Sequence, residues 1–336
     1  MALNRREFLK ASAAGMGGAL AADVHAVQRE PKKLPPDAVG MLYDSTLCIG
    51  CKACMSACKQ ANGMPPEVAG QTDPLWDTPL ETSGRTLNVI KLYQNGSAEQ
   101  KDRDIDGYAF MKRHCMHCVD PSCVSACPVS AMTKDPSTGI VEHHADRCIG
   151  CRYCVYSCPF GIPKYEYDDP FGQIQKCEFC SHLQAEGKMP ACCDVCPTGA
   201  SLFGRVDDLQ SEVRRRLQMQ PGDEVEFPRG KLGGGQPGHT APAAEYIQAV
   251  YGEKELGGTQ ILYLSAVPFE KLGLPVNVPD VGYPAISEGI QHMLYKWMLI
   301  PALLLAGLTY VVQRNIRAAG HDSDTTPDKT SDEEQS

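Results

Sequence analysis

The most continuous apolar segment of the chain lies near its C-terminus. Residues 297–312 contain no charged side chain, and starting the segment at Met293 adds only Lys296. About twenty helical residues span the hydrocarbon core of a bilayer, which is roughly 30 Å thick. Aromatic rings stand near both ends, where the membrane interface favours them. We therefore predict a transmembrane helix over residues 293–313, with a long buried helix of a soluble core as the alternative.

Shorter apolar patterns predict strands in the rest of the chain. Residues 87–93 and 108–112 are rich in β-branched, aromatic and other apolar residues, and the first segment is followed by Asn95-Gly96, a pair typical of hairpin turns. These two segments are predicted to form a hairpin. A third strand is predicted over residues 260–264, which are largely aliphatic.

One amphipathic helix is predicted in the C-terminal half. Leu209, Val213 and Leu217 recur at helical spacing, and Asp207 stands where it can cap the first turn. The arginines at 214–216 would lie opposite the apolar side. We interpret them as a solvated face, with a docking patch as the alternative.

The N-terminus has the layout of an export signal. Arg5 and Arg6 precede a Phe-Leu-Lys sequence and a weakly apolar stretch over residues 11–22, and the small residues before position 27 suit cleavage after Ala26. Paired arginines in this setting resemble the twin-arginine signal, which exports proteins that are already folded. Residues 1–26 are therefore predicted to be a twin-arginine signal peptide.

The charges beside the apolar segment predict the orientation of the anchor. Arg314 and Arg317 follow it, and cytoplasmic flanks carry an excess of basic residues. Residues 314–336 are then a cytoplasmic tail, acidic from residue 321 onward. The bulk of the protein is predicted on the periplasmic side of the bacterial cytoplasmic membrane.

Composition narrows the class of protein. The 336 residues carry a net charge of −9, so a nucleic-acid partner, which needs a basic face, is not expected. With 43% hydrophobic and 22% charged residues, the chain is neither disordered nor a polytopic membrane protein. Seventeen cysteines are the unusual feature, since a chain of this length builds an ordinary core without cross-links.

Sixteen of the cysteines fall into four ordered groups. Groups one and three share the spacing C-x2-C-x2-C-x3-C, group two has C-x2-C-x4-C-x3-C, and group four has C-x2-C-x11-C-x3-C. The members, in chain order, are Cys48, Cys51, Cys54 and Cys58; Cys115, Cys118, Cys123 and Cys127; Cys148, Cys151, Cys154 and Cys158; and Cys177, Cys180, Cys192 and Cys196. We assign Cys192 to group four because it preserves the x3 step of the other groups, which leaves Cys193 over. Cys193, which would give an x2 step, is the alternative.

This spacing is typical of iron-sulfur ligation. A [4Fe-4S] cluster takes four thiolates, and in two-cluster ferredoxins the fourth cysteine of a group ligates the other cluster. Pro128, Pro159 and Pro197 follow the fourth cysteines of three groups, as in ferredoxins, whereas Lys59 takes that place in group one. Structural zinc and disulfides are the alternatives, but zinc would leave regular cysteines unused and disulfides would close very small strained loops.

The motifs resemble a known family, the four-cluster ferredoxin-like electron-transfer subunits that accompany molybdenum enzymes and hydrogenases. Within it, the chain is most similar to iron-sulfur subunits of membrane-bound nickel-iron hydrogenases of the hydrogenase-2 type. That similarity rests on the segment leading into Cys48, on HCMHCVDPSCVSACPVSA at 114–131, on CRYC at 151–154, on YGEKELGGTQ at 251–260 and on QHMLYK from Gln291.

The resemblance implies a fold and a set of ligands. The fold would be α+β, with two ferredoxin-like units holding four [4Fe-4S] clusters in a pseudo-two-fold arrangement, insertions and one C-terminal transmembrane helix. In the family, groups one and four share one cluster pair and groups two and three share the other. The implied ligand sets are Cys48, Cys51, Cys54 and Cys196; Cys58, Cys177, Cys180 and Cys192; Cys115, Cys118, Cys123 and Cys158; and Cys127, Cys148, Cys151 and Cys154.

The function implied is electron transfer without catalysis by the chain itself. The partners would be the large and small subunits of a periplasmic nickel-iron hydrogenase, which oxidises H2, and an integral membrane subunit that reacts with quinone. The alternatives are the equivalent subunit of a formate dehydrogenase or another molybdenum oxidoreductase, and a structural adaptor. The residues show no nucleotide fingerprint or hydrolase motif that would supply a substrate site.

Charged and imidazole side chains near the cysteines are candidates for tuning the clusters. Basic residues next to the cysteine groups would offset cluster charge; they are Lys52, Lys59, Arg113, Arg147, Arg152 and Lys176. His114, His117 and His292 are open between a tuning role and an ordinary structural one. The predicted organisation is a signal peptide over 1–26, a cluster domain over 27–204 with its core at 40–204, an extension over 205–290, the helix over 293–313 and the tail over 314–336.

Overall fold

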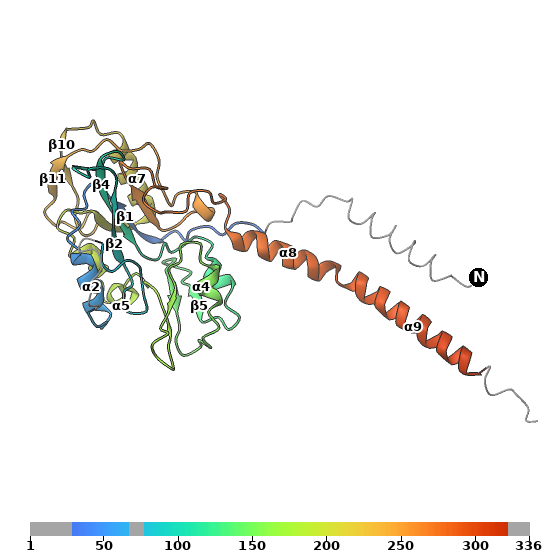
Figure 1. Cartoon of the computed structure of the whole chain (residues 1–336). Helices are drawn as coiled ribbons and strands as arrows, with labels where there is room; N and C mark the ends of the chain where they lie inside the picture. The colour runs from blue at the N-terminus through green and yellow to red at the C-terminus, as the bar shows by residue number, and fades with distance from the viewer. Residues whose placement is uncertain (1–28, 67–76, 322–336) are drawn as a thin grey trace, which may run out of the picture. The chain divides into compact units, whose positions relative to one another are not determined.

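The computed structural model describes residues 29–66 and 77–321, so the predicted signal peptide and residues 322–336 of the tail lie outside the described residues. Two compact units are distinguished: residues 30–285 form the body, which holds all the cysteines, and the C-terminal helical residues from Ile286 belong to a second unit. Each unit is described by itself below, and Figure 1 labels their elements.

A three-stranded sheet with the order β12-β1-β9 organises one side of the body. Strand β1 (Val39–Asp44) lies in the middle, antiparallel to β9 (Ser201–Arg205) and parallel to β12 (Ile261–Leu264). Leu42 is paired with Leu202 on one side and Leu262 on the other, and all three are buried. The strand predicted at 260–264 is confirmed. This strand, β12, comes late in the chain and forms one edge of the sheet.

Helix α7 (Val206–Leu217) packs against this sheet. The predicted helix is confirmed, with Leu209 and Val213 buried on the side facing the sheet. Its N-cap is Arg205, which makes no side-chain cap, so the prediction that Asp207 caps the helix is wrong. Asp207 lies in the first turn instead, where its negative charge favours the helix dipole.

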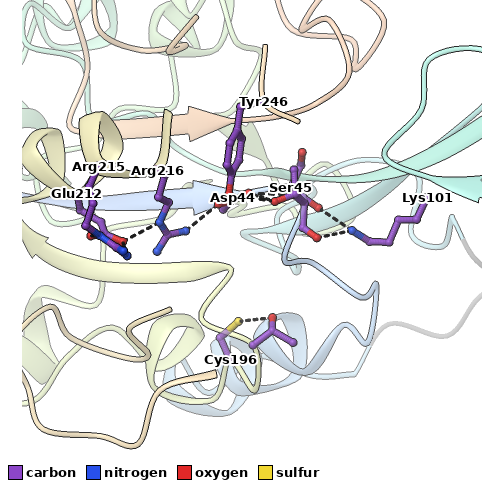
Figure 2. A network of polar contacts seen from close by, with 10 residues as sticks. Asp44, Ser45, Lys101, Cys196, Glu212, Arg215, Arg216 and Tyr246 are labelled. Carbon is purple, nitrogen blue, oxygen red and sulfur yellow. Dashed lines mark hydrogen bonds and ion pairs between the residues drawn. The ribbon is translucent and has the colours of Figure 1, made fainter. Parts of the chain in front are cut away.

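The arginine run at the end of α7 is only partly solvated. Arg214 and Arg215 are exposed, but Arg216 is fully buried, so the interpretation of the whole run as a solvated face is wrong for Arg216. The reason is a pair of carboxylates: Arg216 Nη1 donates to Asp44 Oδ2 at 2.8 Å and its Nε donates to Glu212 Oε1 at 2.8 Å (Figure 2). Charge pairing and the Phe227 ring beneath the guanidinium compensate for its burial.

The predicted hairpin forms, and its connection contains a short third strand. Strands β2 (Val89–Gln94) and β4 (Gly107–Arg113) pair antiparallel, which confirms the strands. The chain turns at Asn95 but does not return directly into β4, because the short strand β3 (Gln100–Lys101) first pairs with β4 in parallel. The resulting sheet has the order β2-β4-β3.

Four short helices that carry cysteines pack in two pairs. Helix α2 (Ala53–Ala61) of group one packs against α6 (Ala191–Asp194) of group four, and α3 (Ser122–Ser125) of group two packs against α4 (Tyr153–Ser157) of group three. The helices therefore cross-pair the cysteine groups one with four and two with three.

The strands next to these helices repeat the same pattern. Strand β1 leads into group one and pairs antiparallel with β9, which follows group four. Strand β6 (Val141–His143) leads into group three and pairs antiparallel with β5 (Met132–Lys134), which follows group two. The body thus contains two related strand-and-helix arrangements, one around groups one and four and one around groups two and three.

Smaller elements complete the body. They are the hairpins of β7 (Lys164–Tyr165) with β8 (Ile174–Gln175) and of β10 (Glu224–Phe227) with β11 (His239–Pro242), the helix α5 (Ser181–Ala185) in group four, and the 3-10 turn η1 (Glu255–Gly257). Strands or helices therefore stand before and after each cysteine loop in the chain.

The C-terminal residues form two consecutive helices, α8 (Tyr283–Trp297) and α9 (Leu299–His321). Among the described residues one helical stretch, Tyr283–Arg317, is long and apolar enough to cross a bilayer, and no residue of its apolar 18-residue window is buried. The break at Met298 is explained by Pro301, which lacks the N–H that would continue the ladder from α8. The predicted span of 293–313 falls within this stretch.

Candidate metal centres

The loops of groups one and three have the same backbone conformation. Gly50 and Gly150 have φ of 70° and 69°, and Lys52 and Arg152, which precede helices α2 and α4, have φ of 59° and 63°. Equal sequences, CIGC, therefore fold into equal loops that place the first three cysteines around one point. Left-handed residues bend the chain sharply enough for this, which is why glycine occupies the first of them.

In groups two and four the third cysteine is positioned by the first turn of a helix that follows a proline. Pro121 and Pro190 are N-cap residues of α3 and α6, and Cys123 and Cys192 are the second residues of these helices. The equivalent positions of Cys123 and Cys192 explain how an x4 step in one group and an x11 step in the other lead to the same local geometry.

The first set of cysteines lies around a common cavity. Cys48, Cys51, Cys54 and Cys196, together with Lys52 and Ser201, line a cavity with about 320 Å³ of space not filled by atoms, part of which is open to solvent. We call this position site A. Three of its cysteines come from group one and the fourth from group four, as the helix pairing requires.

The second set lies around a cavity of similar size. Cys58, Cys177, Cys180 and Cys192 line about 350 Å³ of unfilled space, which we call site B. Cys193 does not line it and is fully buried in the core. A hydrogen bond from Cys193 lowers the pKa of the Cys192 thiol well below its usual range, and the neighbouring Lys112 lowers it further.

Groups two and three supply the other two sets. Cys127, Cys148, Cys151 and Cys154 line about 290 Å³ of unfilled space, which we call site D. The remaining set, site C, consists of Cys115, Cys118, Cys123 and Cys158. Burial raises the pKa of Cys118, and the adjacent thiols of Cys158, Cys115 and Cys123 raise it further, so these four side chains lie together.

The four sites follow one another in the order A, B, C, D. Burial raises the pKa of Cys54 in site A to about 12, and Cys192 of site B adds to the rise. Burial likewise raises the pKa of Cys177 in site B, with Cys115 of site C among its neighbours. The thiol of Cys123 in site C is in turn affected by Cys154 of site D.

All seventeen cysteines lie within the described residues and none forms a disulfide. No group of three His, Cys, Asp or Glu side chains in the described parts of the chain is arranged to hold a single metal ion. At sites A, B and D the thiols surround cavities instead. Four soft sulfur ligands around a cavity fit a [4Fe-4S] cluster, whose iron atoms each take one thiolate.

Positive side chains line the cavities. Lys52 lies at site A, Lys112 at site B and Arg152 at site D. Lys52 and Arg152 were among the basic residues selected from the sequence. Lys112 was not selected because it lies in a strand, three residues before the nearest cysteine in the sequence. The available signal was its spacing: Lys112 and Phe110 are two residues apart in β4, so both side chains lie on the same apolar face of the strand.

Other candidate residues have mixed surroundings. Lys176 is buried, and its Nζ donates to the carbonyl oxygens of Val141 and Cys177, whereas Lys59 is partly exposed. Lys134 was not selected from the sequence; its Nζ donates to the carbonyl of Cys118 at 2.9 Å, beside site C.

The three candidate histidines differ in burial and in their contacts. His114 is buried and lines site B, and burial followed by the Lys112 charge lowers its pKa well below the usual value. His117 is buried and accepts a hydrogen bond from Val141 N at 3.0 Å. His292 is exposed on α8.

Comparison with known proteins shows the family to which the chain belongs. Two families, each described as a 4Fe-4S dicluster domain, match residues 40–128 and residues 107–206. The hydrogenase-2 operon protein HybA of Escherichia coli O157:H7 is 46% identical over 327 residues, covering 95% of this chain and 98% of that protein. The chain belongs to the HybA family of iron-sulfur proteins.

Two other proteins are similar to the chain at lower identity. Protein NrfC of Escherichia coli strain K12 is 34% identical over 66% of this chain and 88% of its own length. The iron-sulfur subunit of formate dehydrogenase-O from the same strain is 31% identical over 79% of this chain and 78% of its own length. The chain carries several [4Fe-4S] clusters and transfers electrons as an iron-sulfur subunit that is not catalytic by itself.

Proposed function

We propose that sites A, B, C and D each hold one [4Fe-4S] cluster, bound by the four cysteines that surround it. The observation that carries this proposal is the cross-pairing of the cysteine groups: sets drawn from two distant groups line common cavities at sites A, B and D. Helix pairs α2–α6 and α3–α4 and the strand pairs β1–β9 and β5–β6 support a pseudo-two-fold relation between the two halves.

The clusters would supply reversible one-electron transfer, and the chain fixes their order. Electrons then pass from A through B and C to D, or in the reverse direction. Both ends of the series reach the surface: Ile49, next to Cys48, is 55% exposed, and Ile149, next to Cys148, is 66% exposed. Apolar side chains exposed beside the terminal sites suit docking of partner proteins, which desolvates them.

The partners that we propose are a nickel-iron hydrogenase of large and small subunits and an integral membrane subunit that reacts with quinone. The name of the HybA relative, which matches at 46% identity over nearly the whole chain, supports the first. The formate dehydrogenase-O iron-sulfur subunit, at 31% identity, keeps that class as the second candidate.

The membrane partner is assigned to the C and D end of the series. The last residues of the body support this, because Gly282 packs against Asp120, which lies between Cys118 and Cys123 of site C, and α8 begins one residue later. An added Cβ on Gly282 would lie 2.9 Å from Asp120 Cβ, which shows how close the contact is. The hydrogenase then docks at the A end.

The apolar helical stretch supports a proposal for where the protein lies in the cell. We propose that the stretch Tyr283–Arg317 anchors the protein in the cytoplasmic membrane, that the body faces the periplasm, and that the chain is exported by the twin-arginine route. Changing Arg5 and Arg6 to Lys should leave the protein in the cytoplasm with its clusters assembled. Normal export of that variant would contradict the route.

The decisive experiment is purification of the complex from solubilised membranes. Nickel in the copurifying catalytic subunit, together with bleaching of the cluster absorbance when H2 is added, is the expected result. Molybdenum with reduction by formate would support the formate dehydrogenase class instead. Clusters that are reduced by dithionite but by neither substrate in the intact complex would identify a structural adaptor.

A further inference from the structure

Lys112 occupies a position between two of the cysteine sites. It lies on β4 and its side chain is 0% exposed. The residue lines the cavity of site B, while its Nζ donates a hydrogen bond at 3.1 Å to Ser201 Oγ, and Ser201 lines the cavity of site A. The ammonium also contacts the thiol of Cys192 in site B and lies 3.7 Å from Met41 Sδ.

The charge on Lys112 has no carboxylate to balance it. Among the described residues no ion pair joins it to Asp or Glu, and the groups that act on it most strongly are the thiols of Cys192 in site B, Cys54 in site A and the neighbouring Cys193. A buried ammonium is costly unless an opposite charge compensates for it. The compensating charge in the loaded protein must therefore come from the two sites themselves.

We propose that Lys112 is a shared counter-charge for the clusters of sites A and B and holds both of their reduction potentials up. A reduced cluster is one charge more negative than an oxidised one, so a nearby buried cation stabilises the reduced form. This inference rests on the cluster assignment made above. Lys52 and Arg152 differ from Lys112 in this respect, because each lines a single site and belongs to the cysteine loop of that site.

The role is one of electrostatic positioning, so reduction potentials test it better than activity does. The variants are Lys112→Met, which removes the charge and the hydrogen bond, and Lys112→Gln, which removes the charge but retains a donor for Ser201. Lys112→Arg retains the charge. The matched control is Lys59→Gln, the same loss of charge next to Cys58 of site B but on a partly exposed side chain whose Nζ bonds to the carbonyl of Arg85.

The measurement is an EPR-monitored redox titration of the full chain in detergent. Both neutral variants should lower the midpoint potentials of two of the four clusters, making their reduction at least tenfold less favourable, which is about 59 mV for one electron. The other two potentials should stay in place, and Lys112→Arg and Lys59→Gln should resemble the wild type. Unchanged potentials in the neutral variants, or an equal shift in all four clusters, would overturn the proposal.

Iron content separates this proposal from the one that it rests on. Wild-type protein with about sixteen iron atoms per chain supports the cluster assignment, and unchanged potentials in iron-replete variants would then refute the role of Lys112 alone. Wild-type protein that lacks this iron would refute the assignment itself. If Lys112→Met does not fold, Lys112→Gln decides, because it differs from the control only in where the charge is lost.

Discussion

Arg216 on α7 and Asp44 at the end of β1 form a fully buried ion pair, with Nη1 and Oδ2 2.8 Å apart. Asp44 is further held by the hydroxyl of Tyr246, which donates to Oδ2 at 2.7 Å (Figure 2). Thr46 Oγ1 donates to Asp44 Oδ1 at 2.6 Å. Since Asp44 precedes Cys48 by one tight turn, this network fixes the start of the site A loop to the central sheet.

Breaking that ion pair should be strongly destabilising. Arg216→Ala leaves the Asp44 carboxylate buried without its cation, and losses of about 3–5 kcal/mol are typical for such a change. We expect Arg216→Ala to lower the midpoint of guanidinium unfolding, followed by loss of the cluster absorbance. Arg214→Ala is the control: its side chain is exposed, and surface substitutions usually stay within about 0.5 kcal/mol. Equal midpoints for the two variants would contradict this description.

Two glycines in equivalent loops should respond differently to the same substitution. Gly50 and Gly150 have nearly equal φ, so an alanine at either one incurs roughly 1–2 kcal/mol of left-handed strain. At Gly50 the new Cβ would also lie 2.4 Å from the ring of Phe110, whereas at Gly150 the nearest atom, on Tyr165, is 3.7 Å away. Gly50→Ala should therefore lose the site A cluster while Gly150→Ala retains site D. EPR spin counting on the reduced variants measures this, and retention of all signals in Gly50→Ala would count against it.

The adjacent cysteines Cys192 and Cys193 provide a matched pair. Cys192 lines site B, and Cys193 is buried away from the cavity. Cys192→Ala should reduce the iron content by about four atoms per chain, or leave a degraded three-iron cluster, while Cys193→Ala should retain the full complement. The opposite pattern in an iron and sulfide assay would assign Cys193 as the ligand.

Asp102 should make the body less stable as the pH rises. Burial raises the pKa of this carboxyl to about 6, although the neighbouring Lys101 opposes the rise. The folded state therefore binds the proton more tightly than the unfolded state, and its stability falls as the pH increases from about 4 to about 6 and stays low above that. Asp102→Asn should remove this dependence and stabilise the protein at pH 7.5 by about 3 kcal/mol. A pH-stability profile that is unchanged in the variant would refute the assignment to Asp102.

Local spacing in the sequence predicts the cysteine loops well, because each loop closes within a few residues. The CIGC loops around Gly50 and Gly150 and the strand at Ile261–Leu264 are of this kind. Relations between distant segments are harder to predict. Strand β12 pairs with β1, which lies far earlier in the chain. Arg216 is buried against Asp44, 172 residues before it.

Lys112 shows a different limit of sequence-based prediction. A lysine near the end of a strand is usually exposed, since burying its charge without compensation is costly. Only the folded structure shows that its neighbours are Cys54 and Cys192, from groups one and four, which lie far from it in the chain. The cavities at sites A and B supply the physical reason for a buried cation that the local sequence lacks.

The central claim is that four clusters are held by sets of cysteines shared between paired groups. The most direct test is spin-quantified EPR of the anaerobically purified, dithionite-reduced chain, combined with iron and acid-labile sulfide assays. We predict about sixteen iron and sixteen sulfide per chain and about four reduced-cluster spins. Iron near eight atoms per chain, or zinc in its place, would contradict the account.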